Sequence, residues 1–166
     1  MTNYRFLYKF MCLILASLLI SGCGFKLRGS ADVPESSRLV TLILKSGTPA
    51  SFEQALRRTL YQQGIALLET APYQLAIKQV KENRRSITLD RKANVDEYEL
   101  LMLVKFEVLN TEGESISGPL VARIERIYDY DADAATASYT LEKEIRSEMW
   151  QSLSERVVRQ FVAQTH

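Results

Sequence analysis

Hydrophobic and polar positions alternate most regularly between residues 97 and 108. One set of alternate positions holds Tyr98, Leu100, Met102, Val104, Phe106 and Val108, and the other holds Glu97, Glu99, Lys105 and Glu107. Because successive side chains of a strand point to opposite faces, this period of two predicts a long strand with one face in the core. Leu101 and Leu103 interrupt the polar set. We therefore expect part of the second face to be covered as well.

Three further segments have the pattern of strands. The run 39–44, Leu-Val-Thr-Leu-Ile-Leu, is nearly continuously apolar, which is typical of a strand covered on both faces. Residues 73–78 alternate with a period of two, and a similar alternation resumes from 120 to 130 after the turn at 111–114. These patterns predict a meander of long antiparallel strands. The short apolar run 65–68 stays open, since it is either a separate short strand or part of the following one.

Two segments have the period of an α-helix. Apolar residues recur at helical spacing between residues 50 and 63, and Gly64 stands where a left-handed residue ends a helix. The outer face of this helix carries Arg57, Arg58, Gln62 and Gln63. From 137 to 163 an apolar stripe at four-residue steps contains Leu141, Ile145, Met149, Leu153, Val157 and Phe161. The second helix is therefore the longer one.

The predicted order of elements is β-α-β-β-β-α. A strand, a helix and a second strand in succession imply a right-handed crossover that joins a parallel pair. We therefore expect an α/β sandwich in which two helices pack on a mixed four-stranded sheet. Residues 38–166 are predicted to form one domain, because the chain that remains after the leader is enough for a single core but not for two.

The first 22 residues have the organisation of an export signal. Arg5 and Lys9 precede an apolar run from Phe10 to Ile20, which is too short to span a bilayer. The small residues Ser21-Gly22 follow at the expected cleavage point. Residues 1–22 are therefore predicted to be a signal peptide that is cleaved.

Cys23 follows the cleavage point directly, and Ile20-Ser21-Gly22-Cys23 resembles the bacterial lipobox. This resemblance implies that the Cys23 thiol receives diacylglycerol and that its new amine is palmitoylated, which anchors the mature protein in a membrane. Gly24 stands where an aspartate signals retention in the inner membrane, so the resemblance implies the outer membrane of a Gram-negative cell. The alternative is an ordinary secretory signal with an incidental cysteine. Residues 23–37 are predicted to form a lipidated tether.

The net charge gives no general attraction to polyanions. The chain has 21 basic and 20 acidic residues, and loss of Arg5 and Lys9 with the leader leaves 19 basic residues. Of the two cysteines, Cys12 lies in the leader and Cys23 is the lipidation site, so we expect no disulfide. Any binding of anions must therefore depend on a local cluster of charges.

The sequence lacks the usual residues of catalysis. Its single histidine is the terminal His166, and it has neither a glycine-rich phosphate loop nor a nucleophile elbow. Asp129, Asp131 and Asp133 have the alternate spacing of a calcium loop but lack its central glycine and distant glutamate. We interpret these aspartates as a polar turn that caps the last helix. We therefore expect no enzyme activity, no cofactor and no metal site.

One local excess of positive charge stands out between residues 78 and 92. Its basic residues, Lys78, Lys81, Arg84, Arg85, Arg91 and Lys92, outnumber the acidic residues Glu82 and Asp90. Arginine forks bind phosphate oxygens in a bidentate manner, so this cluster beside Ile87 and Leu89 is a candidate site for an amphiphile with a phosphorylated head. The alternative is a solvated hairpin whose charges prevent edge pairing.

Several short motifs are distributed along the mature chain: the run Cys23 to Gly29, the pair Val33-Pro34, the run Leu42 to Ser46, Leu56, Leu60, Gly64-Ile65 and Glu97-Tyr98. Together they resemble the LptE family, the lipopolysaccharide-assembly lipoproteins of the outer membrane. They extend over nearly all of the mature chain. The opening motif gains specificity from the β-α-β-β-β-α order, which this family also has.

The resemblance implies a non-enzymatic partner of LptD, a large outer-membrane β-barrel, in a 1:1 complex. The LptE protein sits within the barrel lumen as a plug, helps the barrel to assemble, and takes part in the insertion of lipopolysaccharide into the outer leaflet. A basic residue before the middle strand is implicated in lipopolysaccharide binding in this family, and Arg91 occupies the matching position, with Lys92 beside it. Arg84 and Arg85 complete the candidate site.

A second basic residue of the family, near the start of the last helix, has no clear counterpart here, because that position falls within 138–140, Ser-Tyr-Thr. Either Lys143 replaces it or direct ligand binding is weaker in this protein. The alternative function is that of another periplasm-facing outer-membrane lipoprotein, which acts as an inhibitor or as a pilot for a different secretion pore.

Overall fold

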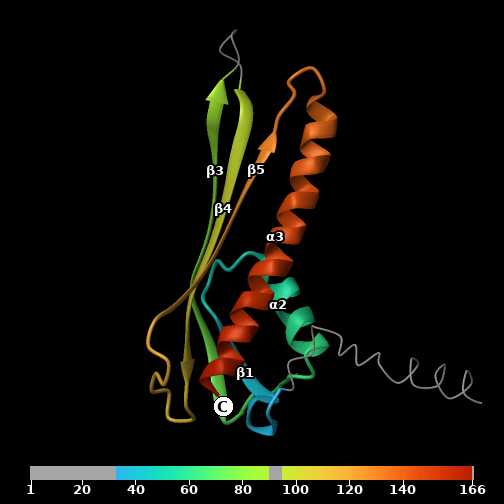
Figure 1. The fold of residues 1–166 in the computed structure, drawn as a ribbon. Helices are drawn as coiled ribbons and strands as arrows, with labels where there is room; N and C mark the ends of the chain where they lie inside the picture. Colours follow the sequence, from blue (N-terminus) through green and yellow to red (C-terminus); the bar gives the residue numbers. More distant parts are fainter. Residues whose placement is uncertain (1–32, 90–94, 166) are drawn as a thin grey trace, which may run out of the picture. The chain divides into compact units, whose positions relative to one another are not determined.

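The computed structural model describes residues 33–89 and 95–165 of the chain (Figure 1). The predicted signal peptide, the lipidation site Cys23 and the two basic residues Arg91 and Lys92 lie outside the described residues. The helices and strands of the described residues belong to one compact unit.

The order of the main elements confirms the predicted β-α-β-β-β-α fold. The bounds are η1 Glu35–Ser37, β1 Leu39–Leu44, α2 Ala50–Gln62, β2 Ala66–Leu67, β3 Tyr73–Leu89, β4 Val95–Leu109, β5 Leu120–Asp129 and α3 Ala135–Gln164. The sheet order is β2-β1-β3-β4-β5, in which β1 is parallel to β2 and β3, while β3, β4 and β5 are antiparallel neighbours. The open segment 65–68 contains the separate strand β2, so the sheet has five strands instead of the predicted four.

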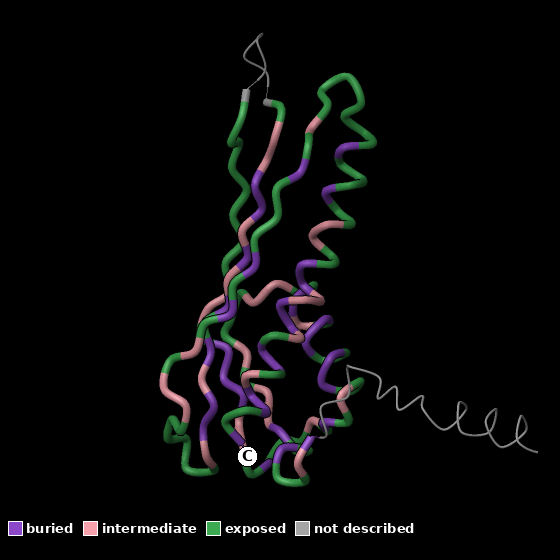
Figure 2. Tube along the Cα trace, in the orientation of Figure 1, coloured by how far each residue is buried: buried purple, intermediate pink, exposed green. Residues whose placement is uncertain are grey.

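Both helices lie on the same side of the sheet (Figure 1). The largest fully buried side chains come from the helices and from the facing strands, and they include Phe52, Leu75, Phe106, Leu153 and Phe161. The rings of Phe52 on α2 and Trp150 on α3 lie 5.6 Å apart between their centroids and join the two helices. Burial is concentrated where α2 and α3 both face the strands, and the far part of β3 is exposed (Figure 2). This core holds α2 and α3 against the sheet.

The second face of the sheet, which we call the open face, is covered only in part, as predicted. No helix of the described residues packs on it, and Leu101 and Leu103 are half-buried, but Ala76 and Leu109 on the same face are 3% and 8% exposed. The first strand also has one exposed side, because Val40 is fully buried whereas Leu39 and Ile43 are 38% and 42% exposed. The apolar run 39–44 was predicted to be buried on both faces, but only one of its faces is buried. The side chains of Leu39 and Ile43 are exposed at the surface.

A β-bulge determines which side chains of β3 face the helices. Ile77 pairs with Phe106, and the next pair along the two strands is Gln79 with Lys105, so that Lys78 is an extra residue on β3. An extra residue reverses the alternation beyond it. Arg84, which pairs with the core residue Leu100, therefore points toward the helix layer, and its neighbour Arg85 points to the open face.

The N-terminal end of the described chain is tied to the end of α3. The hydroxyl groups of Ser36 and Ser37 hydrogen-bond to Thr165, at 2.9 and 3.1 Å from its carbonyl oxygen. Ser37 and Val33 are buried. These residues belong to the segment that the sequence assigned to the tether, and in the structure they pack on the domain.

Of the two predictions at helix ends, the one for the end of α2 is confirmed and the one for the start of α3 is wrong. Gly64 has φ +72°, and Ile65 donates to the Leu60 carbonyl, which confirms a left-handed end to α2. The aspartates before α3 do not cap it, because the N-cap residue is Ala134 and makes no side-chain cap hydrogen bond. Asp131 instead accepts a hydrogen bond from the backbone of Asp133, so the turn is stabilised within itself.

Candidate functional site

Arg84, one of the candidate ligand-binding residues, is engaged in contacts with three elements. Its Nε donates to the Tyr128 hydroxyl at 3.0 Å and lies 3.2 Å from a carboxylate oxygen of Glu142. The guanidinium carbon lies 3.4 Å from the ring centroid of Tyr98, a cation–π geometry. Burial opposes the charge of Arg84, but the hydrogen bond to Tyr128 and the nearby Glu142 carboxylate outweigh it and raise its pKa above the ordinary value.

The Tyr128 hydroxyl also contacts Glu142 on α3 directly, and both side chains are buried. Burial, followed by the hydrogen bond to the carboxylate, raises the pKa of Tyr128 to about 12. At neutral pH the hydroxyl is therefore protonated and donates to Glu142 while it accepts from Arg84. The tyrosine thus links the sheet to the last helix.

Arg146 completes this charged network on the helix. Its Nη2 lies 2.6 Å from Glu142, one helical turn away, and its Nε lies 3.0 Å from Glu82 on β3. We call Arg84, Tyr128, Glu142, Arg146 and Glu82 the inter-layer network. It contains two cations and two carboxylates, so its charges balance. The network holds the first half of α3 to the sheet through polar contacts.

Arg85 lies on the opposite face of the sheet and forms a separate pair with Glu99. Its Nη2 is 2.9 Å from one carboxylate oxygen, and its Nε contacts the other. The hydrogen bonds from Arg85 hold the pKa of the Glu99 carboxyl below its usual range, against the opposing effect of burial. Lys78 similarly lies 3.3 Å from Glu107.

The structure therefore does not bring Arg84 and Arg85 together as one phosphate-binding cluster. Each is paired with a carboxylate of the protein, and they face opposite sides of the sheet. Arg91 and Lys92 fall in the sequence between β3 and β4, outside the described residues. Their assignment to ligand binding stays a prediction.

The start of α3 offers no second basic residue at 138–140. Ser138 is buried, and its hydroxyl accepts from the backbone of Asp131 and lies 3.2 Å from its carbonyl. Lys143 is exposed and lines a groove between α2 and α3.

Sequence reasoning missed the buried Glu142 and its partner Tyr128. The predicted stripe placed Leu141 in the core, but Leu141 is 44% exposed and the adjacent Glu142 is buried. The spacing of Glu142 and Arg146, four residues apart on one helix, was the available signal for an ion pair.

Residues 33–89 and 95–165 were searched for a metal site and for a membrane-spanning helix. In this part of the chain no three His, Cys, Asp or Glu side chains gather as a metal site needs. None of the helices described there has the length and apolar character to cross a membrane.

Comparison with known proteins identifies the family. A family model described as LptE, lipopolysaccharide-assembly, matches residues 39–161. The LPS-assembly lipoprotein LptE of Pectobacterium atrosepticum is 29% identical over 153 residues, which cover 89% of this chain and 81% of the relative. The LPS-assembly lipoprotein LptE of Photorhabdus laumondii is 26% identical over 152 residues, with the same two shares.

Solved structures share the fold at lower sequence identity. The solution structure of lipoprotein B from Nitrosomonas europaea has a TM-score of 0.70 and 21% identity, and the match covers 84% of this chain and 91% of that protein. The crystal structure of a minor lipoprotein from Acinetobacter baumannii has a TM-score of 0.65 and 22% identity, with 78% and 94% covered. The family match extends from the first residue of β1 into the last turns of α3. The chain therefore belongs to the LptE family of non-enzymatic lipopolysaccharide-assembly lipoproteins.

Proposed function

We propose that this protein is the lipid-anchored partner of an LptD-type β-barrel in the outer membrane, where it plugs the barrel, helps it to assemble and takes part in lipopolysaccharide insertion. The observation that carries the proposal is the LptE family match over residues 39–161. Family membership supports a role in lipopolysaccharide transport. The binding of an LptD-type barrel is the more specific part of the proposal.

The N-terminal sequence supports attachment to the membrane. Cys23 follows Ile20-Ser21-Gly22 in a lipobox pattern, and Gly24 does not carry the inner-membrane retention signal. Three acyl chains on Cys23 anchor a protein almost permanently, since each buried methylene contributes about 0.8 kcal/mol. Mass spectrometry of the mature N-terminus tests this step. An unmodified thiol on the mature protein would contradict it.

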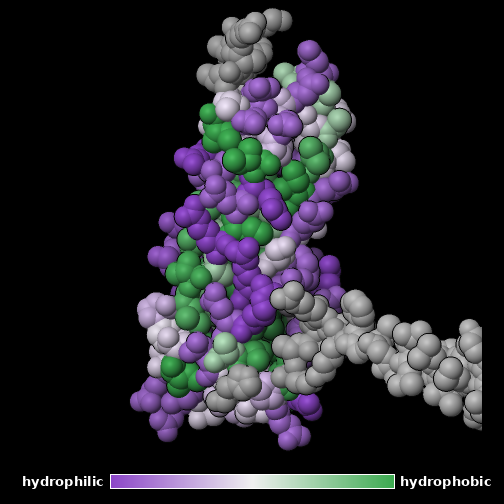
Figure 3. Space-filling model, viewed as in Figure 1, coloured by the Kyte–Doolittle hydropathy of each residue, from purple (hydrophilic) through white to green (hydrophobic). Residues whose placement is uncertain are grey.

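The open face of the sheet supports a role in binding another protein. Ile43, Val121 and Ile127 are 42%, 48% and 56% exposed, and none of them faces the helix layer. On this face they are interspersed with charged residues, since Val121 pairs with Lys105 and Ile127 pairs with Glu99. Figure 3 shows that on the side in view hydrophobic residues form several groups separated by hydrophilic ones. A mixed surface of this kind suits a partner with both apolar and polar contacts.

Purification from the outer membrane tests the proposed function. The full-length protein, tagged at its C-terminus, is extracted in detergent and isolated through the tag. We expect one large β-barrel to co-purify in a 1:1 ratio, and we expect depletion of the protein to leave that barrel misassembled. Isolation of the protein alone, together with normal barrel assembly after depletion, would overturn the proposal.

A further inference from the structure

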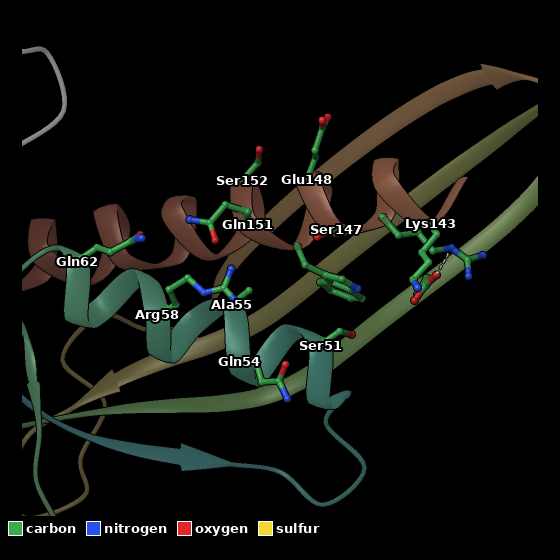
Figure 4. Close-up of a pocket in the computed structure, with 13 residues that line it drawn as sticks. Ser51, Gln54, Ala55, Arg58, Gln62, Lys143, Ser147, Glu148, Gln151 and Ser152 are labelled. Atoms are coloured by element: carbon green, nitrogen blue, oxygen red, sulfur yellow. Dashed lines mark ion pairs between the residues drawn. The ribbon is translucent and has the colours of Figure 1, made fainter. Parts of the chain in front are cut away.

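A groove of about 860 Å³ lies between α2 and α3. This volume falls within the range of small-ligand sites. Figure 4 shows that residues of both helices line it. The ion pair of Arg146 and Glu82 is also part of the lining. Neither Arg84 nor Arg85 lines the groove.

Two of the cations that line the groove are available to a ligand. Arg58 on α2 and Lys143 on α3 are exposed, and within the described residues neither forms an ion pair. The carboxylate of Glu82 is already paired with Arg146. In Figure 4 the side chain of Glu148 extends away from α2. The charge of Arg58 and Lys143 is therefore not balanced inside the groove.

The remaining lining indicates a hydroxyl-bearing ligand instead of an acyl chain. Gln62, Ser147 and Gln151 supply amide and hydroxyl groups, and the Nε2 of Gln151 already donates to Thr59, which leaves its carbonyl oxygen as an acceptor. The only large apolar side chain in the lining is Trp150, which is 4% exposed. The lining therefore offers no cluster of large apolar side chains, which is what the burial of a hydrocarbon tail requires.

We propose that this groove binds a phosphorylated saccharide. Arg58 and Lys143 lie at different places along the groove, and each offers a phosphate group charge-assisted hydrogen bonds, while the amide and hydroxyl groups of the lining bind sugar hydroxyls. The choice of a saccharide rests on the proposed function, because lipopolysaccharide presents sugars and phosphates together. The same chemistry is found in free sugar phosphates, so the experiment includes both sources.

The test is a nuclear magnetic resonance titration of the purified full-length protein in detergent, at low salt. The probes are glucosamine 6-phosphate, inorganic phosphate and, separately, lipopolysaccharide in the same detergent. We compare the wild type with Arg58→Gln/Lys143→Gln. The matched control is Lys45→Gln/Lys105→Gln, which removes the same charge from exposed residues that do not line the groove. Thermal unfolding followed by circular dichroism establishes that both variants fold.

We expect glucosamine 6-phosphate to bind the wild type and the control, and to bind the groove variant at least about tenfold more weakly. A parallel loss for lipopolysaccharide assigns the groove to the lipid-borne saccharide, and a loss confined to glucosamine 6-phosphate assigns it to the free form. Equal binding by both variants would overturn the proposal, as would inorganic phosphate binding as tightly as the sugar phosphate. The titration needs no barrel. Its result therefore does not depend on whether a barrel co-purifies with the protein, and the two proposals can fail independently.

Discussion

The hydroxyl of Tyr128 on β5 hydrogen-bonds to the carboxylate of Glu142 on α3, and this contact joins the two layers of the fold beyond the part of α3 that lies beside α2 (Figure 1). Arg84 and Arg146 contact the same carboxylate, one from the sheet and one from the helix. The first turns of α3 are therefore held by polar contacts, whereas from Ile145 onward the helix also packs through apolar residues such as Met149 and Leu153.

Replacement of Glu142 by alanine tests the strength of this contact. The substitution leaves Arg84, Arg146 and the Tyr128 hydroxyl without their common acceptor. We expect the free energy of unfolding to fall by roughly 1–3 kcal/mol, the usual cost of leaving partly buried polar groups without a partner. Urea denaturation of the purified protein measures it. The control is Glu144→Ala on the exposed side of α3, for which we expect a change within about 0.5 kcal/mol. Equal effects of the two substitutions would contradict a role for the inter-layer network.

The raised pKa of Tyr128 predicts a stability change at alkaline pH. The folded protein binds the hydroxyl proton more tightly than the unfolded chain, because the pKa moves from 10.0 to about 12 on folding. The contribution of the hydroxyl is therefore complete below pH 10 and is lost as the pH rises through about 12. We expect the difference in unfolding free energy between the wild type and Tyr128→Phe to shrink over this window. Denaturation at several pH values measures it, and a constant difference would show that Tyr128 titrates as in the unfolded chain.

The order of the elements was predictable because each long element has an uninterrupted period. The alternation from Tyr98 to Val108 predicts β4, and most of the predicted core positions of β4 are buried in the structure. The exceptions are Tyr98, which is half-buried, and two residues of the other face, Glu99 and Leu109, which are buried. The run Leu39–Leu44 predicts β1 to the residue. Periodicity therefore locates strands and helices, but it does not reveal whether another layer covers their second face.

The candidate site was harder to predict because its geometry depends on one extra residue in β3 and on the gradual rotation of the apolar stripe around α3. The bulge at Lys78 places Arg84 and Arg85 relative to the helix layer, and no local pattern marks a single extra residue. A stripe at four-residue steps also drifts around a helix by about 40° per step, since a turn takes 3.6 residues. Over the five steps from Phe161 back to Leu141 this drift turns Leu141 to the solvent and brings Glu142 inward.

Charge reversal of Arg91 and Lys92 tests the hairpin site that the sequence predicts. We expect Arg91→Glu/Lys92→Glu to weaken lipopolysaccharide binding several-fold at low salt, because phosphate groups lose two cationic partners and meet two carboxylates. Binding to the purified protein in detergent is the measurement. The matched control Lys45→Glu/Lys105→Glu makes the same change in net charge at exposed residues elsewhere. A similar loss in both variants would mean that only net charge matters, and unchanged binding would exclude the site.

Substitutions on the open face of the sheet test whether this face contacts the barrel partner. Val121 and Ile127 lie on β5, and both point away from the helix layer. We expect Val121→Lys/Ile127→Lys to reduce the amount of barrel that co-purifies, because two charged groups replace apolar side chains that contact the partner. Since both positions are about half exposed, unfolding free energy should change by no more than about 1 kcal/mol. The matched control is Tyr61→Lys/Tyr139→Lys on the two helices, where the tyrosines are 84% and 70% exposed. Loss of the barrel only in the control would place the contact on the helix layer instead, and full recovery of the barrel with the strand variant would exclude the open face.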